Sequence, residues 1–474
     1  MASEPSPGAS SPVGSDEPVD LLIAGGTLVA TVDASDREIP GGWVSVRDGL
    51  VEAVGEPGRE PSSRRRISAS GCLVTPGLIN THHHMWQNLT RSYRPMTSTD
   101  FLGWLDVLYP IWARVTAEDV YLSTRVAMAE LATGGCTTTA DHLYLQRPGT
   151  ESLLDAQVLA AGEAGIRLHA TRGSVDRGRS DGSPMPDDML EDRDDVLADC
   201  ARVIDRHHDR SPASLLRIAL GPHSVFGATN ALMTGVAELA DQLDVRLHTH
   251  LSGDQADEAY CQDLHGCRPV DWFESVGYLS GRTWVAHALF PNPAEVQRLG
   301  AAGVGIAHCA TAALLMGVGI APVVDLLAAG APVGVGVDGS SNSDSSSMWL
   351  ESRMVLLAQR FRSGPAAFNA RDVLAMATRN GAACLGRAGE IGELSPGANA
   401  DIAVWPVEGL AWAGAVSDPV EAWLRCGPSA PRHVIVGGKP VITDGAPHSE
   451  DLDQVLGQHK LAARRLQSSP HGVR

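Results

Sequence analysis

The sequence predicts an α/β protein: a (β/α)8 TIM barrel with a small β-sandwich domain built from both chain ends. Between residues 76 and 388, short apolar runs alternate with helix-like segments, which is the rhythm of a parallel sheet. There are eight such runs, and each ends in His, Arg or Asp. On both sides of this stretch, β-rich runs are divided by Gly-Gly and Asp-Gly turns, which are hairpin signals.

The eight runs define the barrel and the place of its site. They end at residues 82–84, 137–142, 167–172, 217–223, 246–250, 284–287, 305–308 and 333–338. The carboxyl ends of barrel strands converge on one face, so the polar groups that end these runs are expected to share a site. The segments between the runs have helical patterns, with residues 117–132 and 292–299 as examples.

The chain ends are expected to form the second unit. Residues 1–19 are rich in Ser, Pro, Gly and acid and predict a disordered tail. Residues 20–75 predict a small antiparallel unit, and residues 389–447 contain strands of similar length and turn chemistry. We expect these two parts to form one β-sandwich beside the barrel of residues 76–388. Residues 448–474 predict a terminal helix, over 451–467, and a tail.

Composition excludes several classes of partner. The 474 residues carry a formal net charge of -19, with 37 Lys+Arg against 56 Asp+Glu, which disfavours nucleic acid or an anionic membrane as the main partner. No stretch approaches the ~20 apolar residues of a membrane span, and the N-terminus lacks the features of a secretory signal. The eight cysteines are scattered without a CxxC pair, which favours free thiols in a reducing cytoplasm.

A histidine cluster predicts a metal site. If the first run is a strand to its end, His82 and His84 point the same way. Taken alone, this run is equally a histidine-rich loop without a ligand. His250, His287 and Asp338 end the fifth, sixth and eighth runs. Three imidazoles and a carboxylate at one barrel face suit Zn2+, with Fe2+ as the second choice.

The motifs resemble those of the amidohydrolase superfamily. The resemblance spans residues 21–445 and is carried by residues 76–84, 130–138, 248–250, 286–287, 337–340 and 391–401. Within the superfamily, residues 84–91, 103–105, 109–113, 141–144 and 169–174 are similar to the cyclic-amidine deaminase and triazine hydrolase branch, and to the 8-oxoguanine deaminases in particular.

The resemblance implies a hydrolase acting on a C–N bond of a purine-, pterin- or triazine-like heterocycle, and a possible homo-oligomer. His82, His84, His250 and Asp338 would hold one zinc ion. Asp338 would accept a proton from the attacking water, and His287 would orient that water. A flat heterocycle also needs aromatic and convergent polar groups. The candidates for this role are Trp86, Gln87, Trp104, His142, Arg172 and His223.

Two departures from the family pattern concern the substrate. The family reads His-x-x-Glu after the fifth strand, where the Glu shuttles a proton, but this chain has Gly253 at that position. After the seventh strand, residues 308–313 lack the usual polar residues, and residues 314–319 make the rim apolar. We therefore expect an altered substrate or reaction. The alternatives are a triazine-type dehalogenase or dealkylaminase and a catalytically silent binder of heterocycles. The serine-rich residues 339–347 are expected to form an active-site loop.

Overall fold

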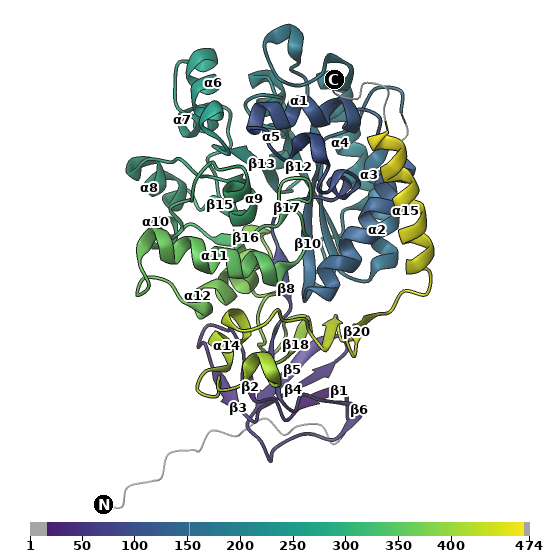
Figure 1. Cartoon of the computed structure of the whole chain (residues 1–474), viewed down its shortest axis with the longest axis vertical. Helices are drawn as coiled ribbons and strands as arrows, with labels where there is room; N and C mark the ends of the chain where they lie inside the picture. The colour runs from purple at the N-terminus through teal and green to yellow at the C-terminus, as the bar shows by residue number, and fades with distance from the viewer. Residues whose placement is uncertain (1–16, 151, 469–474) are drawn as a thin grey trace, which may run out of the picture.

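The computed structural model describes residues 17–150 and 152–468, and a closed barrel of eight parallel strands dominates it (Figure 1). The predicted tail lies outside the described residues except for residues 17–19, of which Val19 already begins a strand. The barrel strands are, in order around the barrel, β8 (Leu78–Asn80), β10 (Cys136–Leu143), β11 (Arg167–Ser174), β12 (Leu216–Pro222), β13 (Leu247–Leu251), β14 (Thr283–His287), β15 (Gly305–His308) and β16 (Val333–Val335). The predicted fold class is confirmed.

Helices surround the barrel and cover its upper rim (Figure 1). The outer helices are α2 (Ala117–Thr133), α3 (Leu153–Ala164), α4 (Arg193–His207), α5 (Asn230–Gln242), α7 (Pro269–Ser275), α8 (Pro293–Ala301), α10 (Val323–Ala328), α11 (Met348–Ser363) and α12 (Ala370–Ala375). Three helices from the loops after strands contribute to the rim: α1 (Phe101–Trp112), α6 (Gln255–His265) and α9 (Ala310–Leu315). The two predicted helices correspond to α2 and α8. Thr116 caps α2 and Asn292 caps α8, each through a capping box.

The first and last barrel strands are interrupted, which corrects the expectation of one strand up to His84. Strand β8 stops at Asn80, and β9 (His83–His84) pairs in parallel with β17 (Asp338–Gly339) beyond the barrel. The chain passes close to Gly336 at this point, where an added Cβ atom would lie 3.0 Å from the Cβ of His82. This second short pairing brings the chain of His84 beside the chain of Asp338.

Small side chains around one tryptophan fill part of the barrel interior. Ile79, Ala140, Ala219 and Ala307 cluster with the fully buried Trp284. The indole Nε1 of Trp284 donates a hydrogen bond of 3.0 Å to the carbonyl oxygen of Thr81. Trp284 therefore fixes the chain immediately before the first histidine of the site.

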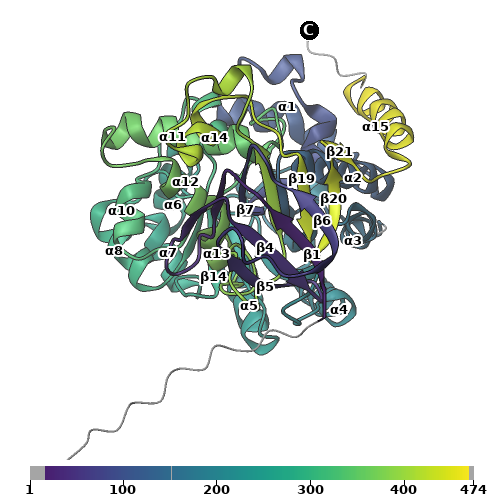
Figure 2. The same cartoon turned by 90° about the horizontal axis from the view of Figure 1, so that it is seen from below.

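Both chain ends build a β-sandwich below the barrel, as predicted (Figures 1 and 2). One sheet has the order β5 (Leu50–Gly55), β4 (Trp43–Arg47), β1 (Val19–Ala24) and β6 (Ser63–Ser68). The other has the order β21 (Ala446–Pro447), β20 (Lys439–Thr443), β19 (His433–Val436), β18 (Ile402–Pro406), β7 (Cys72–Pro76), β2 (Leu28–Ala30) and β3 (Glu38–Pro40). The N-terminal part is not purely antiparallel, since β1 pairs in parallel with β6 and β2 with β7.

The two sheets share one apolar core, in which Ile23 and Val44 of the first sheet cluster with Val74, Ile402 and Ile435 of the second. The residue boundaries given for the two units stay predictions.

The predicted C-terminal helix is α15 (Leu452–Gln467), which lies along α2 (Figure 1). His459 Nε2 lies 2.7 Å from Oδ1 of Asn88, in the segment that follows His84. Arg465 forms an ion pair with Asp119 at the start of α2. None of the helices in the described residues combines the length and apolar character needed to cross a membrane.

Candidate metal centre and cavity

Three imidazoles and one carboxylate meet at the upper end of the barrel. Nε2 of His84 lies 3.1 Å from Nε2 of His250. Oδ1 of Asp338 lies 3.4 Å from Nε2 of His82 and 3.5 Å from Nε2 of His84. Four atoms from three separate strands and the loop that follows β8 therefore gather around one point, although their residues span more than half of the chain.

Hydrogen bonds on the far side of each ring leave the Nε2 lone pairs free. Nδ1 of His84 lies 2.8 Å from the carbonyl oxygen of His142, and Nδ1 of His250 lies 2.7 Å from that of His223. A carbonyl can only accept, so in both rings Nδ1 carries the proton and Nε2 does not.

The tautomer of His82 is set through a second histidine. Nδ1 of His248 lies 2.9 Å from the carbonyl oxygen of Trp284, so His248 is protonated there. Its Nε2 then accepts from Nδ1 of His82, at 2.8 Å. Nε2 of His82 is consequently unprotonated, buried, and without a hydrogen-bond partner among the described residues.

Burial keeps the imidazoles neutral. Desolvation, with repulsion from neighbouring imidazoles, holds the pKa of His82 and of His84 well below the usual value. Burial likewise lowers the pKa of His250 to about 4. All three rings are therefore neutral at pH 7 and present lone pairs, as metal ligation requires.

Asp338 and His287 are held on unusual backbone conformations. Their φ angles are 59° and 77°, in the left-handed region that non-glycine residues rarely adopt. Oδ1 of Asp338 accepts from the amide of Gly339 at 2.8 Å, and Oδ2 accepts from Nδ2 of Asn342 at 2.9 Å. Nε2 of His287 lies 3.9 Å from Oδ2 of Asp338. Such clustered strain is typical of functional sites.

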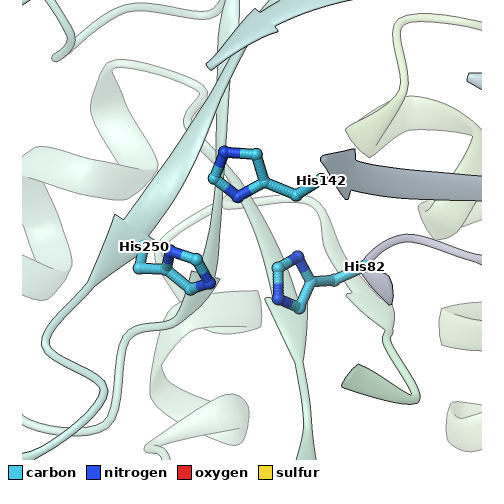
Figure 3. Close-up of side chains that lie close together, drawn as sticks. All are labelled: His82, His142 and His250. Carbon is cyan, nitrogen blue, oxygen red and sulfur yellow. The ribbon is translucent and has the colours of Figure 1, made fainter. Parts of the chain in front are cut away.

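A fourth histidine borders the cluster. Figure 3 shows the rings of His82, His142 and His250 around a common space, and ligand atoms of these three lie within 4.8 Å of one another. Nε2 of His142 lies 2.8 Å from the carbonyl oxygen of Gly221, which makes that nitrogen a donor. His142 thus has its own hydrogen bond, and its carbonyl orients His84.

The donor set fits a divalent cation of the zinc class. A tetrahedral zinc ion with Zn–N bonds of about 2.0–2.1 Å holds its ligand atoms roughly 3.3 Å apart. The spacings of 3.1, 3.4 and 3.5 Å bracket that value. The unpartnered buried Nε2 of His82 supports the same conclusion, since buried polar atoms normally have partners.

A cavity opens above these residues. His84, His250, His287 and Asp338 lie in its wall. The remaining lining is mixed, with polar groups near the cluster and apolar groups opposite. The other lining residues are Gln87, Phe101, Trp104, Leu105, Tyr144, His223, Ser224, Phe226, Gly253, Asp257, Ala312, Ala313, Met316, Val318 and Asn342. The apolar rim after β15 is therefore part of the cavity wall.

Of the six side chains predicted to contact a substrate, Gln87, Trp104 and His223 line the cavity. Trp86 does not line it; its ring packs edge-on against Tyr144 and Trp112. His142 lies in the histidine cluster instead.

Arg172 is also absent from the cavity wall. Its guanidinium is held by Glu191 at 2.7 Å and by Asp199 at 2.9 Å, outside the cavity. Arg172 ends a predicted run as the other candidates do, but its side chain contributes to the packing around β11.

The sequence prediction missed several residues of the site. His248 stands two positions before His250 on the same strand face, a signal the sequence did contain. Asn342 lies in the serine-rich loop that was expected at the site. Tyr144 and Asp257 line the cavity from a loop and from α6, where no periodic pattern marks them.

Comparison with known proteins agrees with this site. Residues 73–441 match the model of the amidohydrolase family. The chain is 42% identical over 441 residues to 8-oxoguanine deaminase of Pseudomonas aeruginosa, covering 92% of this chain and 97% of that protein. It is 35% identical over 444 residues to hydroxydechloroatrazine ethylaminohydrolase of Pseudomonas sp. (strain ADP), covering 90% and 91%.

Solved structures give the same result. The crystal structure of atrazine chlorohydrolase from Arthrobacter aurescens complexed with zinc matches with a TM-score of 0.88 and 33% identity, covering 94% of this chain and all of that one. An adenosine deaminase from Xanthomonas campestris with bound zinc shares the fold, with a TM-score of 0.87 at 23% identity. The resemblance predicted from the motifs is confirmed: this chain belongs to the amidohydrolase family, in its branch of deaminases and triazine hydrolases.

Proposed function

We propose that this protein is a zinc-dependent hydrolase of the deaminase type, which releases ammonia from a cyclic amidine in a purine-, pterin- or triazine-like heterocycle. One observation carries the proposal: the free Nε2 atoms of three neutral histidines and the Asp338 carboxylate converge at the floor of a cavity. Relatives that act on such heterocycles support it.

His82, His84, His250 and Asp338 would hold the zinc ion. When bound, zinc lowers the pKa of water toward about 7, so that hydroxide is available at neutral pH. The Asp338 carboxylate accepts the proton of the attacking water. His287, 3.9 Å from Asp338, orients that water toward the amidine carbon. Trp104 and Gln87 in the cavity wall would hold the flat ring.

An amine in place of ammonia is the second candidate. Ala312, Ala313, Met316 and Val318 make one side of the cavity apolar, which suits an alkylamino substituent better than a free amino group. The similarity to an ethylaminohydrolase supports this reading. The eight cysteines, all unpaired in the structure, are consistent with the proposed cytoplasmic location.

The test is a turnover assay on protein loaded with one equivalent of zinc. Aminopurines, aminopterins, aminopyrimidines and amino- or alkylamino-triazines are incubated with it, and both ammonia and alkylamine are measured. The His287→Asn variant is the matched control: it should keep its zinc and lose about 10²–10⁴-fold in rate. Zinc retention without release of either product from any substrate would favour the silent binder.

A further inference from the structure

Gly253, the position where the family carries a glutamate, does not leave an open space. A Cβ atom at residue 253 would lie 3.0 Å from Cδ2 of His287 and 3.4 Å from Oδ2 of Asp257. The glycine lets the imidazole and this carboxylate approach one point from two sides. The Asp257 carboxylate from α6 therefore lies in van der Waals contact with the point where a side chain at residue 253 would begin.

The Asp257 carboxylate is fixed through one oxygen and free at the other. Oδ2 accepts from the amide of Gly253 at 2.6 Å and from that of Asp254 at 3.3 Å. Oδ1 has no hydrogen-bond partner in the described part of the chain. Neighbouring atoms do not cover this oxygen completely. Asp257 lines the cavity and is 5% exposed. Since Oδ2 is held by the two amides, we take Oδ1 as the oxygen that is available to a substrate.

The surroundings of Asp257 favour a carboxyl group that exchanges its proton near neutrality. Burial raises the pKa of Asp257 to about 7. The two amide hydrogen bonds act in the opposite direction and lower this pKa, whereas the charges of Asp254 and Glu258 raise it further. Two other titratable groups face Asp257: His287 from β14 and the phenol of Tyr109 from α1. The charge of Asp257 raises the pKa of Tyr109. An acid is most effective when its pKa is close to the working pH.

We infer that Asp257 is the acid that protonates the ring nitrogen of the substrate, in the role that the family motif gives to a glutamate at residue 253. This inference rests on the proposed function, and it removes the reason to expect an altered reaction from Gly253 alone. The carboxyl group comes from α6, four residues further along the chain, instead of from the end of β13.

The proton steps balance with water as the only other reactant. Water attacks the amidine carbon and forms the C–O bond, while its proton passes to Asp338. The electron pair of the C=N bond moves to the ring nitrogen, which takes the proton of Asp257. The C–N bond to the exocyclic amine then breaks, and the amine leaves as ammonia with the proton from Asp338. The hydroxyl proton of the new carbonyl returns to Asp257.

The variant Asp257→Asn tests the inference on the zinc-loaded full-length enzyme. Its side-chain oxygen can still accept the two amide bonds that start α6, so zinc content and melting temperature should stay near those of the wild type. We expect kcat to fall by about 10²–10⁴-fold. The wild type should lose activity as the pH rises above about 7, where Asp257 gives up its proton. The Asn variant should not show this alkaline loss, because the acid is gone.

Two further variants make the outcome decisive. Glu258→Gln removes the neighbouring carboxylate, which bonds Ser252 and Arg268 but does not line the cavity. It should keep kcat near the wild-type value and keep the alkaline loss of activity, with the midpoint moved to lower pH because one charge that raises the pKa of Asp257 is gone. Asp257→Glu keeps the carboxyl group, so it should keep the alkaline loss of activity with a shifted midpoint. An Asn variant with wild-type kcat and pH profile would overturn the inference, as would an Asp257→Glu profile identical to that of the Asn variant. An inactive wild type would instead count against the proposed function.

Discussion

Nδ1 of His82 donates to Nε2 of His248, and His248 in turn donates to the backbone of Trp284. The ring of His248 also stacks on the indole of Trp284, with centroids 4.4 Å apart. A buried chain of two imidazoles therefore fixes how His82, the first of the proposed metal ligands, is turned and which of its nitrogens is free.

Replacing His248 by Ala should weaken the metal site without removing a ligand. Loss of such a supporting partner typically costs 10–100-fold in metal affinity. Competition with a chelator, read by elemental analysis, measures the change. His169→Ala is the control, because His169 also packs on Trp284, at 5.2 Å, but neither of its ring nitrogens has a hydrogen-bond partner among the residues that the structure describes. Equal zinc loss from both variants would mean that packing on Trp284, not the hydrogen bond, holds the site.

Gly253→Ala should lower kcat while leaving zinc content unchanged. The added methyl group would press on the ring of His287, at 3.0 Å, and so turn the imidazole that orients the water. We expect about a tenfold loss or more, since small displacements of reacting groups cost up to 10²-fold. Gly162→Ala in α3 is the control, because nothing lies within 4 Å of the new atom. For the same reason Gly253→Glu should not raise activity. An increase would show that His287 and the neighbouring cavity wall can move to accommodate a side chain at residue 253.

Asp141→Asn should change how stability depends on pH. Burial raises the pKa of Asp141 to about 7. The hydrogen bonds that its carboxylate accepts from Gln157 and from the Met85 amide lower this pKa, but burial has the larger effect. Between pH ~4 and 7 the unfolded chain has lost this proton and the folded chain retains it. The free energy of unfolding therefore falls as pH rises, by up to about 1.4 kcal/mol per unit.

The Asn variant lacks this contribution, so its stability relative to the wild type should improve from pH 5 to pH 7. Urea unfolding at several pH values measures the difference. Asp263→Asn, an exposed site on α6, controls for the loss of one charge. Parallel curves for the wild type and Asp141→Asn would contradict an elevated pKa at Asp141.

Met316→Asp should distinguish the two candidate leaving groups. Met316 lies in the apolar wall of the cavity, where a carboxylate would disfavour an alkyl substituent far more than a free amino group. We expect KM to rise about tenfold or more for an alkylamino-triazine and much less for an aminopurine. The neighbouring Leu315 is 57% exposed and does not line the cavity, so Leu315→Asp should leave both KM values unchanged.

The residues that the sequence predicts well are those placed by topology. His82, His84, His250 and Asp338 follow runs whose carboxyl ends must meet in a closed parallel barrel, so their convergence could be predicted without any contact information.

Polar ends alone do not tell which way a side chain points. Arg172 ends a predicted run in the same manner, but in the structure it lies two residues before the end of β11 and pairs with Glu191. The interruption between β8 and β9 lies where the chain of His82 passes close to Gly336, and the position of Asp257 depends on where α6 begins. Both follow from packing between distant segments, which no local pattern encodes.

Strand β7 leads directly into the barrel strand that precedes His82, and in its sheet it pairs with β18. The two partners are separated by more than 300 residues of chain. At ribosomal rates of about 5–20 residues per second, roughly 15–65 s pass between the synthesis of β7 and that of β18. During that interval the segment that leads to the first two histidines has an unpaired edge, so the nascent chain is vulnerable to aggregation until β18 has been synthesised.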